Sequence, residues 1–250
     1  MDKNRLRQIL NLAAIVATIV INILANALPF NGQTTGEISD KFDVFFTPAG
    51  YVFSIWGLIY LGLLAYAIFQ LLPGQRDNEQ LNRIGYYFIL SSIANIVWIF
   101  LWHYEYFPLT VIVMLILLFS LITIYLRLNT GAPPVSANMR WFVYIPFSIY
   151  LGWISVATIA NVTILLDYWQ WSGWGISPEI WLVILLIVGW GLTFAITYRR
   201  GDIAYGLVIL WAYIGIAIRN TGNSFVVTAS WIAAAVVALI VTARLFRRNA

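Results

Sequence analysis

Eight apolar runs that contain no Asp, Glu, Lys or Arg constrain this chain more than any other feature. A helix rises about 1.5 Å per residue, so about 20 apolar residues cross the ~30 Å hydrocarbon core of a bilayer. The runs meet this length or come close to it, and the seventh is the shortest. We therefore expect an all-α, polytopic transmembrane helix bundle with eight spans. The spans are Ile9–Leu28, Ala49–Leu72, Ile84–Trp102, Phe107–Leu126, Trp141–Leu166, Ile180–Tyr198, Ile203–Ile218 and Ser224–Ala243.

The composition of the whole chain agrees with a membrane protein and excludes several other classes. Of the 250 residues, 62% are hydrophobic and 10% are charged, which is far more apolar than a soluble domain. The chain has no cysteine, which excludes disulfides and thiol catalysis, and its single histidine, His103, excludes a multi-histidine metal site. The net charge of +4 is not evidence for nucleic acid as a partner. The bilayer itself is the expected partner.

The basic residues predict how the spans are oriented. With both termini on one side, twelve of the 14 Lys and Arg fall in the segments on that side, and only Lys41 and Arg219 fall on the other. Basic segments remain in the cytoplasm. We therefore expect an integral protein of the inner (plasma) membrane, with both termini cytoplasmic.

The first span has a second interpretation. The basic start, the apolar run and "ANA" at Ala25–Ala27 are also typical of a cleaved signal peptide. The run is long for such a peptide, so the sequence favours a retained span.

Two long external segments lie between spans. The segment before Ala49 is polar and contains glycine, as in a lid over a pocket. The second, "DYWQWSGWGISPEIW", holds four Trp and is typical of an aromatic belt at the membrane surface.

Three spans carry aromatic and amide side chains at spacings of three, four and seven, which share one face of a helix. Two interpretations remain open. The rings fill a helix bundle, or they line a cavity for a flat apolar ligand that Asn and Trp N–H groups orient. The small Ala157 leaves room on its stripe. The stripes are Phe53, Trp56 and Tyr60; Asn95, Trp98 and Trp102; and Tyr150, Trp153, Ala157 and Asn161.

These stripes resemble the signatures of the TspO/translocator-protein family, also called peripheral benzodiazepine receptors or tryptophan-rich sensory proteins. "PAGYVFSIWGLIY" (Pro48–Tyr60) is similar to the second-span signature but lacks its proline before Val-Trp. "NIVWIFLWH" (Asn95–His103) and "YLGWISVATIAN" (Tyr150–Asn161) are similar to the third-span and fifth-span signatures. The resemblance covers about residues 8–166.

The resemblance implies a five-helix bundle around a pocket for porphyrins, sterols or synthetic aromatic ligands. The ten stripe residues then map onto this pocket, and porphyrin or haem enters as a ligand rather than as a fixed cofactor. We expect residues 1–170 to form the TspO-like membrane domain and residues 171–250 a three-helix extension. The family often forms dimers, so a homodimer is also expected.

The residues leave several functions in competition. A binding or sensory protein is the first, but only Lys41 and Arg219 could meet an anionic ligand at the outer surface. A transporter of small apolar or zwitterionic compounds is the second, without proton coupling because no ionisable group lies within a span. An assembly or regulatory partner also fits the sequence.

Catalysis is the least favoured function. No paired carboxylates and no nucleophile–base pair can be assembled from the sequence. His103 could ligate a haem iron, but at the outer end of the third span we expect it to face water.

Overall fold

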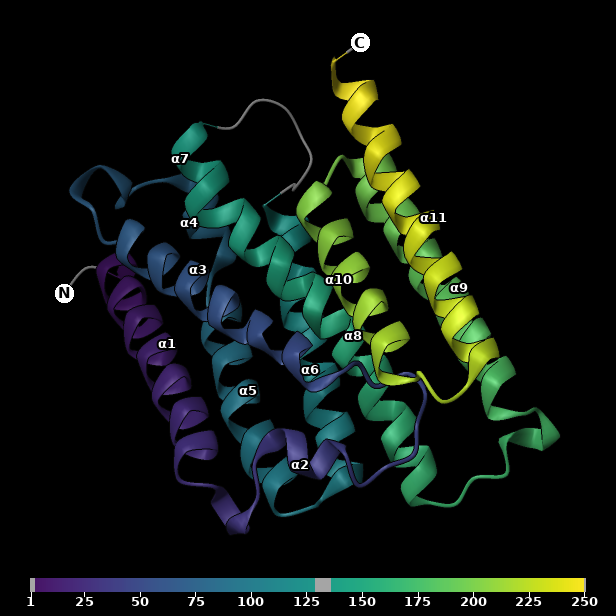
Figure 1. Cartoon of the computed structure of the whole chain (residues 1–250). Helices are drawn as coiled ribbons and strands as arrows, with labels where there is room; N and C mark the ends of the chain where they lie inside the picture. The colour runs from purple at the N-terminus through teal and green to yellow at the C-terminus, as the bar shows by residue number, and fades with distance from the viewer. Residues whose placement is uncertain (1–2, 129–135, 250) are drawn as a thin grey trace.

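The computed structural model describes residues 3–128 and 136–249, and the regular structure of these residues is entirely helical. Eight apolar helices dominate it (Figure 1), which confirms the all-α helix bundle. With the turns that adjoin them, six are long and apolar enough to cross a membrane, whereas α5 and α10 have 17 residues each. The eight are α1 Lys3–Ala27, α3 Ile55–Phe69, α5 Tyr87–His103, α6 Phe107–Arg127, α8 Ile145–Tyr168, α9 Pro178–Thr193, α10 Ile203–Arg219 and α11 Ser224–Asn249.

Shorter elements adjust where the long helices begin and end. A 3₁₀ turn over Gly50–Ser54 leads into α3, and π-turns over Arg140–Tyr144 and Phe194–Tyr198 adjoin α8 and α9. Gly85, with φ of 62°, ends α4, so the third apolar helix begins later than the predicted span. The short helices are α2 Thr35–Ser39, α4 Glu79–Ile84 and α7 Ala137–Met139.

The first five long helices form one bundle, in which α8 packs against α3 and α6. Helix α1 contacts α3 and α5, α5 contacts α6, and both α3 and α6 contact α8. Much of α8 is therefore buried, including Tyr150, Trp153 and Asn161. This central position brings the fifth-span stripe against the other two.

The last three helices attach to this bundle through α10. Helix α10 contacts α8, and α11 contacts both α9 and α10. The Trp211 indole donates to the Val52 carbonyl over 3.2 Å, and the Ala49 N–H donates to the Gly215 carbonyl over 3.1 Å. The C-terminal helices are thereby joined to the start of α3. The division into domains at residue 170 stays a prediction.

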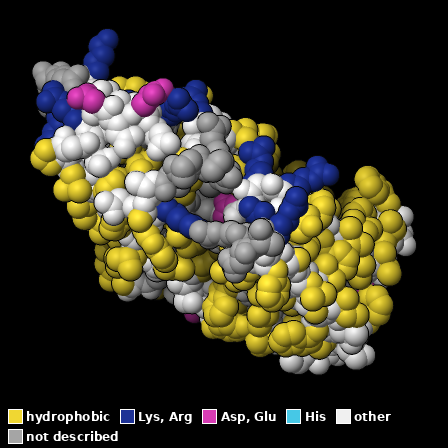
Figure 2. All heavy atoms as spheres, turned by 90° about the horizontal axis from the view of Figure 1, so that it is seen from above, with side chains coloured by type: hydrophobic (Ala, Val, Ile, Leu, Met, Phe, Trp, Pro, Cys, Tyr) yellow, Lys and Arg dark blue, Asp and Glu magenta, His cyan; other side chains and the backbone are white. Residues whose placement is uncertain are grey.

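Exposed apolar side chains cover the sides of the molecule, as lipid contact requires. Leu61, Phe119 and Leu239 are all more than 60% exposed. Figure 2 shows Lys and Arg side chains gathered on one end of the bundle, with hydrophobic side chains around its flanks. This pattern is that of a membrane-embedded protein.

A buried carboxylate lies just before α10. Asp202 caps this helix by accepting from the Tyr205 N–H over 3.2 Å, and the Ser148 hydroxyl of α8 donates to the same carboxylate. Burial raises the pKa of Asp202 above its usual range. Asp202 therefore joins α8 to the start of α10.

The segment between α1 and α3 is fixed to the helix bundle by two ion pairs and a hydrogen bond. Lys41 pairs with Glu105, Arg219 pairs with Asp40, and the Trp102 indole donates to the Thr35 carbonyl over 3.1 Å. Helix α2 also carries a complete capping box between Thr34 and Glu37.

His103 does not face water, so that expectation was wrong. It is fully buried, with Nδ1 2.8 Å from the Ile99 carbonyl. The ring of Phe30 lies edge-on to it at 5.7 Å, and Asn31 donates to its carbonyl. The turn after α1 therefore folds over the end of α5 and covers the histidine.

Candidate functional site

The stripes of α3 and α8 meet in one aromatic cluster. Trp56 stacks on Tyr60 with ring centroids 5.3 Å apart, and lies 6.0 Å from Tyr150 and 6.1 Å from Trp153. Phe53 meets Trp153 edge-on at 5.7 Å. We call these five residues the interior aromatic cluster. The sequence predicted that their stripes face each other only through the resemblance, and the structure brings them together.

Asn95, on α5, connects this cluster to α1. Its side-chain oxygen accepts from Asn22 over 2.8 Å, and its amide nitrogen donates to the Tyr150 hydroxyl over 3.2 Å. All three side chains are buried. An amide in this setting ties helices together, because its polar atoms need partners away from water.

The third-span tryptophans belong to a second set of contacts. The Trp98 indole donates to Asn161 over 3.0 Å, and Asn161 donates to the Thr110 hydroxyl over 2.8 Å. Trp98 also stacks on Trp102 at 5.0 Å. The donors of Trp98, Asn95 and Asn161, which the sequence interpretation directed at a ligand, are thus engaged within the protein.

Ala157 lies between the two sets. It is one helical turn from Trp153 and one from Asn161 on α8, and it is partly buried. Of the ten predicted residues, Phe53 lies on the turn before α3 and the other nine lie on α3, α5 and α8.

Two polar atoms of the interior aromatic cluster remain unpaired. Trp153 is only 2% exposed, yet its Nε1 has no hydrogen-bond partner among the described residues. The hydroxyl oxygen of Tyr60 is also buried and forms no hydrogen bond of standard geometry there, although the Asn95 side chain lies near it. Buried polar groups are almost always paired, so each unpaired one calls for an explanation.

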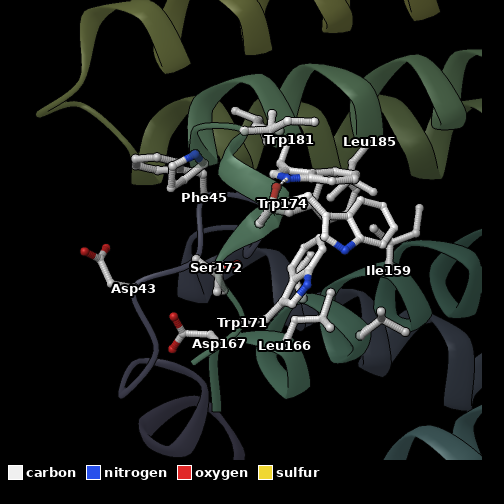
Figure 3. A pocket seen from close by; sticks show the side chains of 18 of the residues that line it. Asp43, Phe45, Ile159, Leu166, Asp167, Trp171, Ser172, Trp174, Trp181 and Leu185 are labelled. Carbon is white, nitrogen blue, oxygen red and sulfur yellow. Dashed lines mark hydrogen bonds between the residues drawn. The ribbon is translucent and has the colours of Figure 1, made fainter. Parts of the chain in front are cut away.

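A cavity of about 680 Å³ lies between α8, α9 and the segment before α3, apart from the interior aromatic cluster. Its α8 wall includes Thr158, Ile159 and Val162, and none of the ten predicted residues lines it. Figure 3 shows Trp171, Trp174 and Trp181 around it, with the carboxylates of Asp43 and Asp167 nearer one side.

Sequence reasoning missed this cavity for a definite reason. It assigned the tryptophans after α8 to an aromatic belt, because a loop gives no periodicity from which to infer a shared face. The segment predicted as a lid does contribute, through Asp43 to Phe46. The close spacing of Trp171 and Trp174 was the signal that could have indicated a ring cluster.

The described residues offer no group of three or more His, Asp or Glu side chains that could hold a metal ion. The chemistry that they do offer is aromatic contact and hydrogen bonding.

Eight apolar helices, lipid-facing flanks and a buried aromatic interior define a polytopic helical membrane protein. The family model of TSPO-like proteins matches residues 8–243, and the chain belongs to this family. The match extends beyond the stripes and includes the last three helices. No curated protein and no solved structure matches the chain.

Proposed function

We propose that this TSPO-like protein binds a flat apolar ligand, such as a neutral porphyrin or a sterol, against the interior aromatic cluster. The ligand lies between α3, α5 and α8, on the faces that carry the ten residues predicted from the sequence. Stacking on Trp and Tyr rings supplies most of the affinity.

The unpaired Nε1 of Trp153 is the observation that carries this proposal. This donor belongs to a side chain that is almost fully buried and flanked by Phe53 and Trp56. Leaving it unpaired costs about 1–3 kcal/mol. A ligand acceptor that receives this hydrogen bond removes the cost and fixes the ligand's orientation.

The charges at the outer end favour a neutral ligand. Lys41 and Arg219, the two basic residues of the predicted outer segments, are paired with Glu105 and Asp40. An anionic ligand would have to break one of these pairs. Porphyrins whose propionates are esterified, and sterols, make no such demand.

The substitution Trp153→Phe tests the proposal, because it keeps an aromatic ring and removes the N–H. We expect it to weaken binding of a porphyrin dimethyl ester roughly tenfold, the equivalent of one hydrogen bond. The measurement is a titration of the purified full chain in neutral detergent, followed by the porphyrin absorbance band rather than by Trp fluorescence.

Trp141→Phe is the matched control, since Trp141 is 66% exposed and lies away from the cluster. It should leave the dissociation constant unchanged. Equal affinities for the wild type and Trp153→Phe, or no saturable binding by the wild type, would refute the proposal.

We also propose that both termini lie in the cytoplasm and that the protein resides in the plasma membrane. The basic end of Figure 2 supports this orientation through the positive-inside rule. Cysteines introduced at Gln75 and at Gly222, between helices at opposite ends of the bundle, should be labelled from opposite sides of sealed cells by an impermeant maleimide. Labelling of Gln75 from outside would reverse the orientation.

A further inference from the structure

We propose that the cavity between α8 and α9 binds a hydrophobic organic cation. Its aromatic walls would hold the apolar part of the cation, and Asp43 and Asp167 would supply the counter-charge. This site is distinct from the interior aromatic cluster and does not depend on the function proposed for it.

Three indoles form the aromatic part of the wall. The ring centroids of Trp171 lie 5.2 Å from those of both Trp174 and Trp181, and Trp174 lies 6.0 Å from Trp181. The Trp181 Nε1 is already committed to the Gly173 carbonyl at 3.0 Å. Trp181 therefore offers a ring face rather than a donor, and indole faces attract cations.

The two carboxylates of the cavity have no basic partner among the described residues. Two other acids at this end do have basic partners, since Asp40 pairs with Arg219 and Glu105 with Lys41. Asp43 and Asp167 both line the cavity. The charge that would complete this site is therefore positive.

The cavity has the shape that an amphipathic molecule needs. Its α8 wall runs from Asp167 back to Thr158, nine residues along the helix, or roughly 13 Å. The far end is apolar, with Ile159 and Leu185 (Figure 3). Its volume of about 680 Å³ lies within the range of small-molecule sites.

Two residues of the loop between α8 and α9 adopt an unfavourable backbone conformation. Trp174 has φ of 54° and Gln170 has φ of 53°, in a region that bulky side chains seldom adopt. The adjacent glycines Gly173 and Gly175 also have positive φ. Strain of this kind concentrates at binding sites, where the surrounding structure maintains it.

Two ions of the same shape and opposite charge test the proposal. Tetraphenylphosphonium and tetraphenylborate present the same four phenyl rings, so ring contact alone cannot distinguish them. We expect saturable binding of one tetraphenylphosphonium per chain, and no saturable binding of tetraphenylborate, in equilibrium dialysis of the full chain in neutral detergent.

Variants then locate the site. Asp43→Asn combined with Asp167→Asn, and separately Trp171→Ala, should each weaken tetraphenylphosphonium binding about tenfold or more. The matched controls are Asp77→Asn, an exposed acid outside the cavity, and Trp169→Ala, a 58% exposed neighbour that does not line it. Both controls should bind as the wild type does.

Equal saturable binding of the two ions would overturn the proposal, and so would an unchanged affinity in the double Asn variant. A circular dichroism melt of each variant separates lost binding from lost folding. Trp153→Phe, which affects the interior aromatic cluster, should leave tetraphenylphosphonium binding unchanged, so the two sites can fail independently.

Discussion

Replacing Gly215 with leucine is expected to separate α10 from the start of α3 and to destabilise the protein by about 3 kcal/mol or more. A Cβ at this buried position would lie 2.2 Å from Val52 Cγ2 and 3.1 Å from Pro48 Cβ. Val52 is fully buried, so its side chain cannot shift away from the added atoms without displacing its neighbours. The backbone bond from Ala49 to the Gly215 carbonyl would be lost as well.

The free energy of unfolding, measured by SDS titration in mixed micelles, checks this expectation. Gly191→Leu is the control, because Gly191 is exposed and a Cβ there meets nothing within 4 Å. It should unfold at nearly the wild-type SDS fraction. Equal stabilities of the two variants would mean that α10 does not contact Val52 as described.

Asn95→Leu is expected to lower the free energy of unfolding by about 2 kcal/mol, because it removes hydrogen bonds from buried polar groups on two other helices. The substitution removes one of the two acceptors of the Asn22 amide, which also donates to the Thr18 carbonyl, and it removes the donor to the Tyr150 hydroxyl. Leucine fills a similar volume, so the loss reports on hydrogen bonding more than on packing. The same SDS titration measures it, with the shift expected toward lower SDS.

Asn26→Leu provides the comparison for this second variant. Asn26 is exposed and donates only to the Asn22 carbonyl of its own helix. It should therefore change stability by less than about 0.5 kcal/mol. If Asn26→Leu and Asn95→Leu are equally destabilising, the hydrogen bonds of Asn95 to Asn22 and Tyr150 contribute nothing to the free energy of unfolding.

The fold was largely predictable because a bilayer leaves few choices. Apolar runs free of charge must form helices in lipid, so the positions of the eight helices follow from the amino-acid sequence. Their ends were less predictable. The third helix begins at Tyr87 rather than Ile84 because Gly85 adopts a left-handed conformation, and composition does not reveal where a glycine does so.

The site was only partly predictable, because a shared helix face does not say which partner an atom chooses. Spacing grouped Asn95 with Trp98, yet the structure gives them different partners, Tyr150 and Asn161. His103 was expected at the surface, and the turn around Phe30 buries it through a contact across many residues. The cavity beside Trp171 is lined in part by a loop. A loop has no regular spacing of side chains, so its residues could not be assigned to a shared face from the sequence.

The most direct test of the account is the structure of the protein with a bound porphyrin dimethyl ester, determined by cryo-electron microscopy in a nanodisc. The account predicts ligand density between α3, α5 and α8, stacked on Trp56, with an acceptor within hydrogen-bond distance of Trp153 Nε1. Density confined to the cavity between α8 and α9, with Trp153 Nε1 still unpaired, would contradict it.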